Sequence, residues 1–381
     1  MTRTVRILGT HGVPAAYGGF ETAAENVARH LVDNGWRVVV YCQEPGTGPV
    51  RYDTWEGIER VTVPEPRDGW LGTSRFDLKV VRHAARYGDL CLTFGYNTAV
   101  LNTWHKLRGI PTVINMDGIE WSRARWGPVR QAILWTNERI GCLVGDALIA
   151  DHPEIAVYLR KHAKDRKIAT ITYGAPTVDS APTTPVTDRG LEPGRYLTLI
   201  ARPIPENSIV ELLTAFSRRP RGVRLAVLGD VGHDDPYHQA IRAAAGDEVD
   251  LLGPVYDPAT VTALRFHSAA YLHGHTVGGT NPSLVEALGA GNPVLAHDNE
   301  YNRWTAGDAA LFFTGVDDAD EALTRLLADD ALRTELGENA RKRHAAEFTW
   351  AHVAGQYEEL LERHLPAKDR APRQHRQGAA A

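Results

Sequence analysis

Short apolar runs alternate with helix-length amphipathic segments along almost the whole chain. In the first half, runs rich in Val and Ile and bounded by turn residues are expected to be buried strands, at 5–9, 37–42, 90–95, 112–116, 147–150 and 168–172. Between two of them, apolar residues recur at helical spacing, at Phe20, Ala24, Val27 and Leu31. This alternation predicts an α/β fold, with a doubly wound parallel sheet that has helices on both faces.

The pattern pauses once and then restarts. Residues 179–194 are dense in Pro, Thr, Asp and Gly and show no apolar periodicity. Further strand-like runs follow at 196–201, 224–229, 249–253, 269–274, 293–297 and 310–313. We therefore expect two Rossmann-like domains that face a cleft, over 1–178 and 195–347, joined by a linker at 179–194. An amphipathic helix over 348–365 and a disordered basic tail over 366–381 complete the prediction.

Composition narrows the class of protein. The net charge of −5 hides an asymmetry, because residues 1–178 hold 22 Lys/Arg against 18 Asp/Glu whereas residues 179–365 hold 16 against 28. The basic excess is too mild for a nucleic-acid-binding domain. The three cysteines, Cys42, Cys91 and Cys142, are scattered and odd in number, which indicates free thiols in a reducing cytosol. No run of about 20 apolar residues indicates a membrane span.

Two loops that follow predicted strands carry residues suited to a phosphorylated ligand. In open α/β sheets, ligands bind outside the carboxyl ends of the strands. The first such loop contains Gly18 and Gly19, whose amides open a helix and can approach a phosphate or a sugar; an ordinary turn is the alternative. Its spacing is not that of a dinucleotide fingerprint. Arg202 follows the first strand of the second half, where it can bind a diphosphate or pair with Glu206.

Residues 273–296, HGHTVGGTNPSLVEALGAGNPVLA, place Glu286 in the first turns of a helix. Its neighbours supply imidazoles, backbone amides and hydroxyls, from His275, Gly278, Gly279, Thr280, Asn281, Pro282 and Ser283. A carboxylate beside a phosphate-binding loop is suited to accept hydrogen bonds from ribose hydroxyls. The alternative is a capping box with Ser283.

A third segment, NMDGIEWSRARWG at residues 115–127, combines carboxylates with aromatic rings. Asp117 and Glu120 can position an acceptor hydroxyl or accept its proton, and a tryptophan face suits the apolar side of a sugar ring. Candidate acceptor-binding residues are Trp121, Arg123 and Trp126. In the structural alternative the tryptophans belong to the core and Glu120 pairs with Arg123 on one helix face.

These features together resemble the retaining nucleotide-sugar glycosyltransferases of the GT-B type, family four. The resemblance rests on the tandem domains, the glycine loop, Arg202, the run H-x(n)-E-A-x-A-x-G-x-P-V and the closing helix F-T-W-x-x-V-A-x-Q-Y, and it covers the chain to about residue 365. THGVPAAYGGFET, NMDGIEWSRARW and HGHTVGGTNPSLVEA are similar to the bacterial rhamnosyltransferase branch. The resemblance implies that the nucleotide binds the C-terminal domain, that the acceptor binds mainly the N-terminal one, and that the last helix crosses back to the first domain.

Carried over residue by residue, Glu286 matches the second glutamate of the family's E-x7-E motif, which the resemblance implies holds ribose. The first glutamate of the motif would fall at 278, where this chain has Gly278, a departure that suits a deoxysugar read by backbone amides. Arg202 matches the diphosphate-binding arginine. The lysine usually found five residues later is Asn207 here. Fewer cations then neutralise the leaving diphosphate, which leaves more of that role to Arg202, to helix N-termini and to a hydrogen-bond donor from Gly18 or Gly19.

The expected function is transfer of a deoxyhexose, L-rhamnose, from a dTDP-linked donor to a glycan or lipid-linked acceptor in cell-surface polysaccharide or glycolipid synthesis. The mechanism implied by the relatives retains the anomeric configuration, with the leaving phosphate accepting the acceptor proton. We expect no cofactor, no metal, no nucleic-acid partner and a cytoplasmic location. Two alternatives remain: a sugar-nucleotide epimerase of similar fold, which needs no acceptor, and a non-catalytic sugar-nucleotide-binding protein.

A basic stripe bears on location. Arg75, Lys79, Arg82 and Arg86 recur at spacings of four, three and four residues, just after Trp70 and Leu71. Such a stripe beside apolar residues can dock on anionic headgroups at the inner face of the cell membrane, although solvated helix faces of this kind are common.

Overall fold

A computed structural model describes residues 3–16, 18–123, 126–366 and 369. The chain divides into two compact units, each described by itself: unit 1 is Met1–Ile171 with Ala354–Ala381, and unit 2 is Thr172–Val353. The division falls at 171 rather than at the expected 178. Most of the expected basic tail, 367–368 and 370–381, lies outside the described residues.

Among the described residues, unit 1 contains an eight-stranded sheet in the order β3-β4-β2-β1-β5-β6-β7-β8. All of its pairings are parallel except β3 with β4. The strands are β1 Thr4–Leu8, β2 Arg37–Pro45, β3 Arg51–Trp55, β4 Ile58–Glu65, β5 Leu90–Phe94, β6 Thr112–Asn115, β7 Ala147–Ala150 and β8 Ile168–Thr170. The central strands are buried throughout, as the continuous apolar runs predict.

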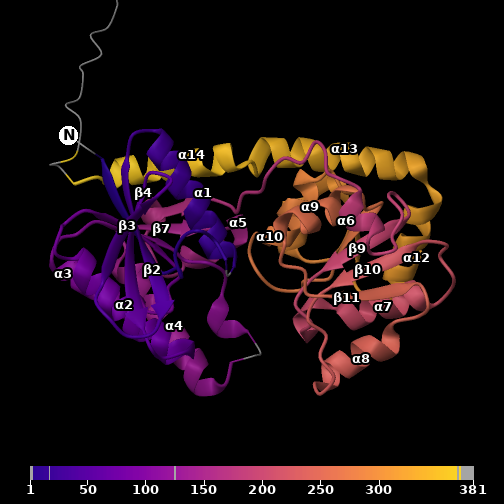
Figure 1. Ribbon diagram of the computed structural model, residues 1–381, viewed down its shortest axis with the longest axis horizontal. Coiled ribbons are helices and arrows are strands. Elements are labelled where there is room, and N and C mark those ends of the chain that lie inside the picture. Colours follow the sequence, from indigo (N-terminus) through magenta and orange to yellow (C-terminus); the bar gives the residue numbers. More distant parts are fainter. Residues whose placement is uncertain (1–2, 17, 124–125, 367–368, 370–381) are drawn as a thin grey trace, which may run out of the picture. The chain divides into compact units, whose positions relative to one another are not determined.

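Helices cover this sheet (Figure 1). They are α1 Gly19–Asp33, α2 Gly69–Ala84, α3 Thr103–Leu107, α4 Pro128–Val144 and α5 Pro153–Leu159, with short 3₁₀ turns η1 Ala99–Asn102, η2 Glu120–Ser122 and η3 Asp165–Lys167. Helix α1 buries Ala24, Val27 and Leu31, three of the four residues whose spacing predicted it.

The last helix, α14 (Trp350–His364), begins in unit 2, and from Ala354 onward its residues belong to unit 1. Its apolar face is buried through Tyr357, Leu360 and Leu361. Glu358 anchors the polar side, since it accepts hydrogen bonds from Trp36 Nε1 and His30 Nε2, each at 2.9 Å. The expected crossover helix is confirmed.

Among the described residues, unit 2 contains a six-stranded parallel sheet in the order β11-β10-β9-β12-β13-β14. Its strands are β9 Tyr196–Ile200, β10 Arg224–Leu228, β11 Val249–Gly253, β12 Ala270–His273, β13 Val294–His297 and β14 Ala310–Phe313. Alternate residues of one strand enter different clusters: Leu197 and Leu199 join one, and Tyr196 joins another. Both faces of the sheet are therefore buried, as expected for a doubly wound fold.

Helices lie around the sheet of unit 2 (Figure 1). They are α6 Thr184–Thr187, α7 Ile209–Ser217, α8 Pro236–Ala244, α9 Pro258–Phe266, α10 Pro282–Gly289, α11 Glu300–Ala306, α12 Val316–Ala328 and α13 Asp330–Glu347, with η4 Pro205–Asn207 and η5 Gly307–Ala309. Unit 2 includes the segment expected to be a linker, 179–194. That segment forms α6, and its Val186 and Leu191 are buried in the same cluster as Tyr196.

Cys42, Cys91 and Cys142 are free and buried, as expected. No helix in the described part of the chain combines the length and the apolarity needed to cross a bilayer.

Candidate functional site

The strand order of unit 2 reverses between β9 and β12, because β10 and β11 lie on one side and β13 and β14 on the other. At such a switch point two loops diverge from adjacent carboxyl ends and leave a ligand-binding crevice. The loops here are 201–208 after β9 and 274–281 after β12. They contain the candidate donor-binding residues of unit 2, apart from those of the helix that follows.

Helix α10 starts directly after the second loop, and its N-cap is Asn281. The Asn281 side chain accepts a hydrogen bond from the Ser283 amide at 3.0 Å, and Pro282 occupies the first helical position, where no amide proton is needed. The alternative of a capping box between Ser283 and Glu286 is therefore wrong. Gly278, with φ of 137°, gives the loop a backbone conformation that favours glycine.

Glu286 forms an ion pair with an arginine that the sequence reading did not single out. Arg265 Nη2, from the last turn of α9, lies 2.6 Å from Glu286 Oε2 and donates to Ser283 Oγ at 3.1 Å. The Arg265 side chain is 9% exposed and that of Glu286 is 30% exposed. Among the described residues Glu286 Oε1 has no hydrogen-bond partner. One carboxylate oxygen is therefore fixed by the protein, and the other is available to a ligand.

The loops of the switch point are tied to each other. The hydroxyls of Tyr271 and Ser283 lie 2.6 Å apart, so one donates to the other, and the carbonyl of Ile200 at the end of β9 lies within reach of both, at 3.2 and 3.3 Å, to accept the remaining proton. The Thr276 amide donates to the Glu206 carbonyl at 2.9 Å. A Cβ added at Gly274 would lie only 2.2 Å from a backbone oxygen of the first loop, so glycine is required there. The start of α10 is thus held against the loop that carries Arg202.

Arg202 is exposed at the start of the loop, whereas Asn207 is buried. The Asn207 side-chain amide donates to the Arg202 carbonyl at 2.8 Å. The Asn207 side chain therefore closes the loop that carries Arg202. A direct contact between Asn207 and the donor stays a prediction.

His275 is half-buried and stacks on His273, with ring centroids 4.3 Å apart and planes at 11°. Its carbonyl accepts hydrogen bonds from Asn299 and Asn302, at 2.9 and 2.8 Å. Burial lowers the pKa of His273 well below its usual range, so this imidazole is neutral beneath His275. Of the other candidate loop residues, Gly279 is half-buried and Thr280 is buried.

In unit 1 the glycine loop follows β1 and leads into α1. Gly18 is the N-cap and is exposed, and no side chain caps this helix terminus. Two glutamates of α1 hold the loop instead: Glu21 accepts from the His11 amide at 2.9 Å, and Glu25 accepts from the Ala15 amide at 2.6 Å. The amides of the first helical turn, including that of Gly19, therefore have no side-chain cap among the described residues.

Asp117 lies just after β6 and has a φ of 52°, which is uncommon for a residue with a side chain. Its amide donates to Asn115 Oδ1 at 2.9 Å, and Asn115 Nδ2 in turn donates to the Tyr357 hydroxyl of α14 at 2.7 Å. The side chain of Asp117 is half-buried. Backbone strain fixed by a buried hydrogen-bond chain is typical of residues placed for a function.

The other candidates in this segment are largely engaged with one another. Glu120 Oε2 lies 2.6 Å from Arg123 Nε, and Glu120 Oε1 accepts from Trp126 Nε1 at 3.0 Å. Trp121 Nε1 donates to the buried Glu138 at 2.9 Å. Both oxygens of Glu120 therefore have partners within the protein, and Glu120 and Arg123 form the pair that the structural alternative describes. The catalytic role of Glu120 and the acceptor contact of Arg123 stay predictions. Trp121 is anchored by Glu138, whereas Trp126 lines an open pocket.

The basic stripe is weaker than the sequence suggests. Glu65, fully buried in β4, pairs with Arg75 at 3.3 Å and Lys79 at 2.8 Å, and α2 ends before Arg86. The pairing with Lys79 lowers the pKa of Glu65, which keeps the carboxylate charged. Two of the four cations are therefore neutralised from within the fold.

Sequence reasoning missed the residues that hold the candidates in place: Arg265, Asn299, Asn302, Glu21, Glu25, Asn115 and Glu138. Arg265 sits in the last turn of a helix, where a basic residue is ordinary, so no local signal marks it. Glu21 and Glu25 of α1 were the easiest of these residues to predict from the sequence, because carboxylates early in a helix that follows a glycine loop are well placed to bind the amides of that loop.

Comparisons with known proteins agree with this architecture. A family model described as glycosyl transferase-like matches residues 202–359, and a second, described as domain of unknown function (DUF1972), matches residues 2–176. No match was found among curated proteins.

Solved structures match over nearly the whole chain. Sucrose-phosphate synthase from Thermosynechococcus elongatus has a TM-score of 0.77 at 19% identity, covering 95% of this chain and 98% of that one. The Anabaena protein HepE in complex with UDP has a TM-score of 0.74 at 16% identity, covering 95% and 100%. α,α-Trehalose-phosphate synthase from Burkholderia vietnamiensis has a TM-score of 0.72 at 14% identity, covering 95% and 100%. These likenesses show the GT-B fold.

Proposed function

Because residues 202–359 match a glycosyl transferase-like family model and the chain has the GT-B fold, we propose that it is a glycosyltransferase that takes a nucleotide-diphosphate sugar as donor and binds the nucleotide at the switch point of unit 2. The ends of β9 and β12 and the start of α10 converge there. Solved proteins of the same fold were captured with UDP, UDP-glucose and UDP-2-fluoroglucose, which supports this class of donor.

The pairing of Glu286 with Arg265 is the observation that carries the proposal. Arg265 fixes one oxygen of a half-exposed carboxylate, and the other accepts hydrogen bonds from ribose hydroxyls. An isolated carboxylate beside a diphosphate would be repelled, whereas one already paired with a guanidinium is close to neutral. The arrangement is therefore compatible with a phosphorylated ligand next to it.

Arg202 binds the diphosphate in this proposal. Arg202 is exposed at the end of β9, and Asn207 fixes the loop beneath it. The amides at the start of α10 and around Gly279 and Thr280 add partial positive charge. Transfer then depends on stabilising the charge that develops on the leaving diphosphate.

For the sugar and the acceptor we propose L-rhamnose, carried by dTDP, moved with retention to a glycan or lipid-linked acceptor in cell-surface polysaccharide or glycolipid synthesis. Gly278, in place of a carboxylate, leaves room and no charge beside the sugar, which favours a deoxyhexose. On unit 1 the strained Asp117 orients the acceptor hydroxyl, while the leaving phosphate takes the proton. No metal takes part in this proposal.

A glutamine at position 286 tests the ribose contact. Glu286→Gln keeps the shape of the side chain but removes the charge, so we expect the dissociation constant for UDP to rise about ten- to a hundredfold. The matched control is Glu321→Gln, at an exposed position of α12, which should leave the constant unchanged. Isothermal titration measures both. Equal UDP affinity in the wild type and Glu286→Gln would contradict the assignment.

Comparison of two nucleotides sharpens the same test. UDP has two ribose hydroxyls and dTDP has one, so the effect of Glu286→Gln should be larger for UDP if the carboxylate binds both. A thermal-shift screen of dTDP-rhamnose against UDP- and GDP-sugars tests the donor, because only a ligand of the native state raises the melting temperature with concentration. A larger shift with a UDP- or GDP-sugar would refute the dTDP-rhamnose proposal.

A further inference from the structure

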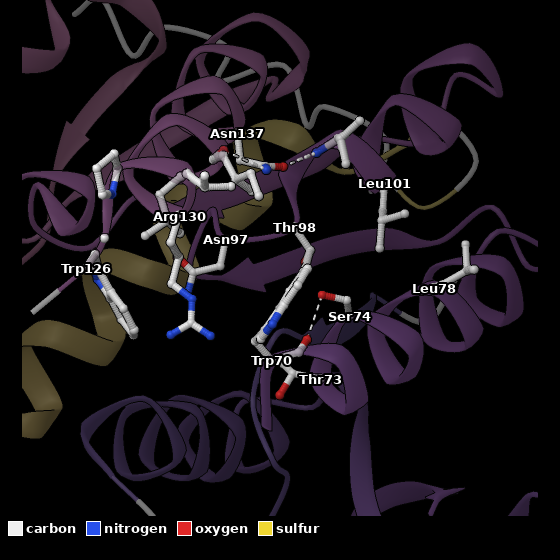
Figure 2. A pocket seen from close by; sticks show the side chains of 16 residues that line it. Trp70, Thr73, Ser74, Leu78, Asn97, Thr98, Leu101, Trp126, Arg130 and Asn137 are labelled. Carbon is white, nitrogen blue, oxygen red and sulfur yellow. Dashed lines mark hydrogen bonds between the residues drawn. The ribbon is translucent and has the colours of Figure 1, made fainter. Parts of the chain in front are cut away.

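Unit 1 contains a pocket of about 760 Å³ between α2, the η1 turn and the start of α4 (Figure 2). Its walls are mainly apolar, with Trp70, Leu78, Val100, Leu101, Trp126 and Ile133 among the residues that line it. The volume lies in the range of sites that enclose small organic ligands. None of the residues that the proposed function uses lines it, and Trp126 is the one candidate acceptor-binding residue that does.

The rim of this pocket exposes large apolar side chains to water. Trp70 is 52% exposed, Val129 77% and Ile133 40%. Further exposed apolar residues lie on the adjoining α3 and on α4, namely Trp104, Leu107, Trp135 and Leu143. Exposed apolar surface around a concavity marks a binding site, because its burial by a ligand is favourable.

Most of the uncharged polar side chains that line the pocket are already hydrogen-bonded within the protein, and Asn97 is the exception among the described residues. Asn137 accepts from the Val100 amide at 2.9 Å and donates to the Ile133 carbonyl at 3.0 Å. The Thr98 hydroxyl donates to Asp77 at 2.7 Å, and Ser74 donates to the carbonyl one turn earlier in α2. The interior therefore offers a ligand apolar contact and few hydrogen bonds, which favours a hydrocarbon over a sugar.

One cation stands at the opening. Figure 2 shows the Arg130 guanidinium extending toward the rings of Trp126 and Trp70, and its carbon lies 4.5 and 6.0 Å from their centroids. Within the described part of the chain Arg130 has no carboxylate partner. A positive charge held by aromatic rings at the mouth of an apolar pocket complements an anionic head with a hydrocarbon tail.

We propose that this pocket binds the hydrocarbon chain of a lipid phosphate, with the phosphate at Arg130. The identification of that lipid as the glycosyl acceptor rests on the proposed function, whereas the binding itself does not. Of the two acceptor classes in the proposed function, a glycan and a lipid-linked sugar, the apolar pocket favours the lipid-linked one. A single enclosed chain also fits better than docking on an anionic bilayer, because Glu65 neutralises two cations of the neighbouring basic stripe.

Titration of the full-length protein with alkyl phosphates, below their micelle concentrations, tests this. Decyl phosphate should bind at least about tenfold more tightly than hexyl phosphate, since each added methylene buries apolar area. Ile133→Gln should weaken decyl phosphate binding about tenfold. Leu143→Gln, on the same helix and 75% exposed but outside the pocket, should leave it unchanged. Arg130→Gln should remove the advantage of decyl phosphate over 1-decanol.

Equal affinity of the wild type, Ile133→Gln and Leu143→Gln would overturn the proposal, and so would affinity independent of chain length. Sedimentation tests whether a second copy of this chain occupies the pocket instead. The lipid proposal would also be overturned if no alkyl phosphate bound and if the wild type and Leu143→Gln formed a dimer that Ile133→Gln did not. UDP titration of the same variants keeps the two proposals apart. If Glu286→Gln leaves UDP affinity unchanged while decyl phosphate still binds the pocket, only the proposed function is refuted. If Glu286→Gln weakens UDP binding but decyl phosphate does not bind the pocket, only the lipid proposal is refuted.

Discussion

At the residue scale, two buried carboxylates of unit 1 show how partners set charge. Glu65 has Lys79 and Arg75 beside it, and the hydrogen bond from Lys79 lowers its pKa. Asp77, on α2, has only the Thr98 hydroxyl as a hydrogen-bond partner among the described residues, and burial raises its pKa to about 6. Burial penalises the charged form unless an opposite charge compensates. Asp77 therefore costs stability at neutral pH.

Asp77→Asn tests this cost. The folded pKa lies above the ordinary value of 3.8, so between pH 3.8 and about 6 the unfolded state binds fewer protons and stability falls as pH rises. The variant keeps an acceptor for Thr98 and lacks the titration. We expect its unfolding free energy, relative to wild type, to rise with pH by up to about 3 kcal/mol.

Urea unfolding at pH 4, 5.5 and 7.5 measures that difference. Asp33→Asn, at an exposed position of α1, is the control and should show none of this dependence. A difference between Asp77→Asn and wild type that stays constant with pH would show that Asp77 is not the group responsible.

The candidate site was predictable in part at this scale. Glu286 and Arg202 stand out because loops after parallel strands gather at one edge of a sheet. The pairing of Glu286 with Arg265 depends on how α9 packs beside α10, which no local pattern encodes. Glu120 shows the converse: its position indicates chemistry, yet Trp126 and Arg123 take both of its oxygens.

At the scale of elements, α14 supports the acceptor side of the proposal. Its Tyr357 hydroxyl accepts from Asn115, whose other side-chain atom holds the amide of Asp117 in the left-handed conformation. A helix contributed by the end of the chain thereby braces the loop after β6. This link spans residues far apart in sequence and is invisible to periodicity.

Removal of one hydroxyl tests that brace. Tyr357→Phe leaves the buried Asn115 amide group without its acceptor, so we expect a loss of about 1–3 kcal/mol in unfolding free energy. Catalytic turnover should fall as Asp117 loses its support. Tyr256→Phe, at a residue 85% exposed in unit 2, is the control and should change neither. Denaturant unfolding together with an activity assay decides, and unchanged stability in Tyr357→Phe would contradict the link.

Strand β3 and helix α6 were not foreseen, for different reasons. The β3–β4 hairpin turns at Glu56 and Gly57, both with positive φ, and β3 is an edge strand whose residues are mostly exposed. An exposed strand shows no apolar alternation, so it does not read as a strand. Helix α6 was hidden by the Pro and Thr residues around it, although Val186 reaches the core.

At the scale of the whole molecule, two parallel sheets were predictable because their strands are buried on both faces and read as continuous apolar runs. The position of the division at 171 was not, since the segment that follows packs on unit 2 through contacts distant in sequence. The final return of α14 to unit 1 follows from the resemblance rather than from any pattern.

Metal independence is a prediction about the intact enzyme. In the proposed mechanism Arg202 and helix N-termini stabilise the leaving diphosphate, so we expect turnover to be unchanged in excess EDTA. The measurement is product release from the donor before and after chelation, with added Mg²⁺ as the restoring condition. A loss of activity that Mg²⁺ restores would contradict this prediction.

The most direct test of the central claim is hydrogen exchange of the full chain with and without UDP or dTDP. The account predicts slower exchange at residues 201–208 and 274–290 of unit 2, and a smaller effect in Glu286→Gln than in Glu321→Gln. Protection confined to the loops of unit 1, with residues 274–290 exchanging as in the free protein, would contradict it.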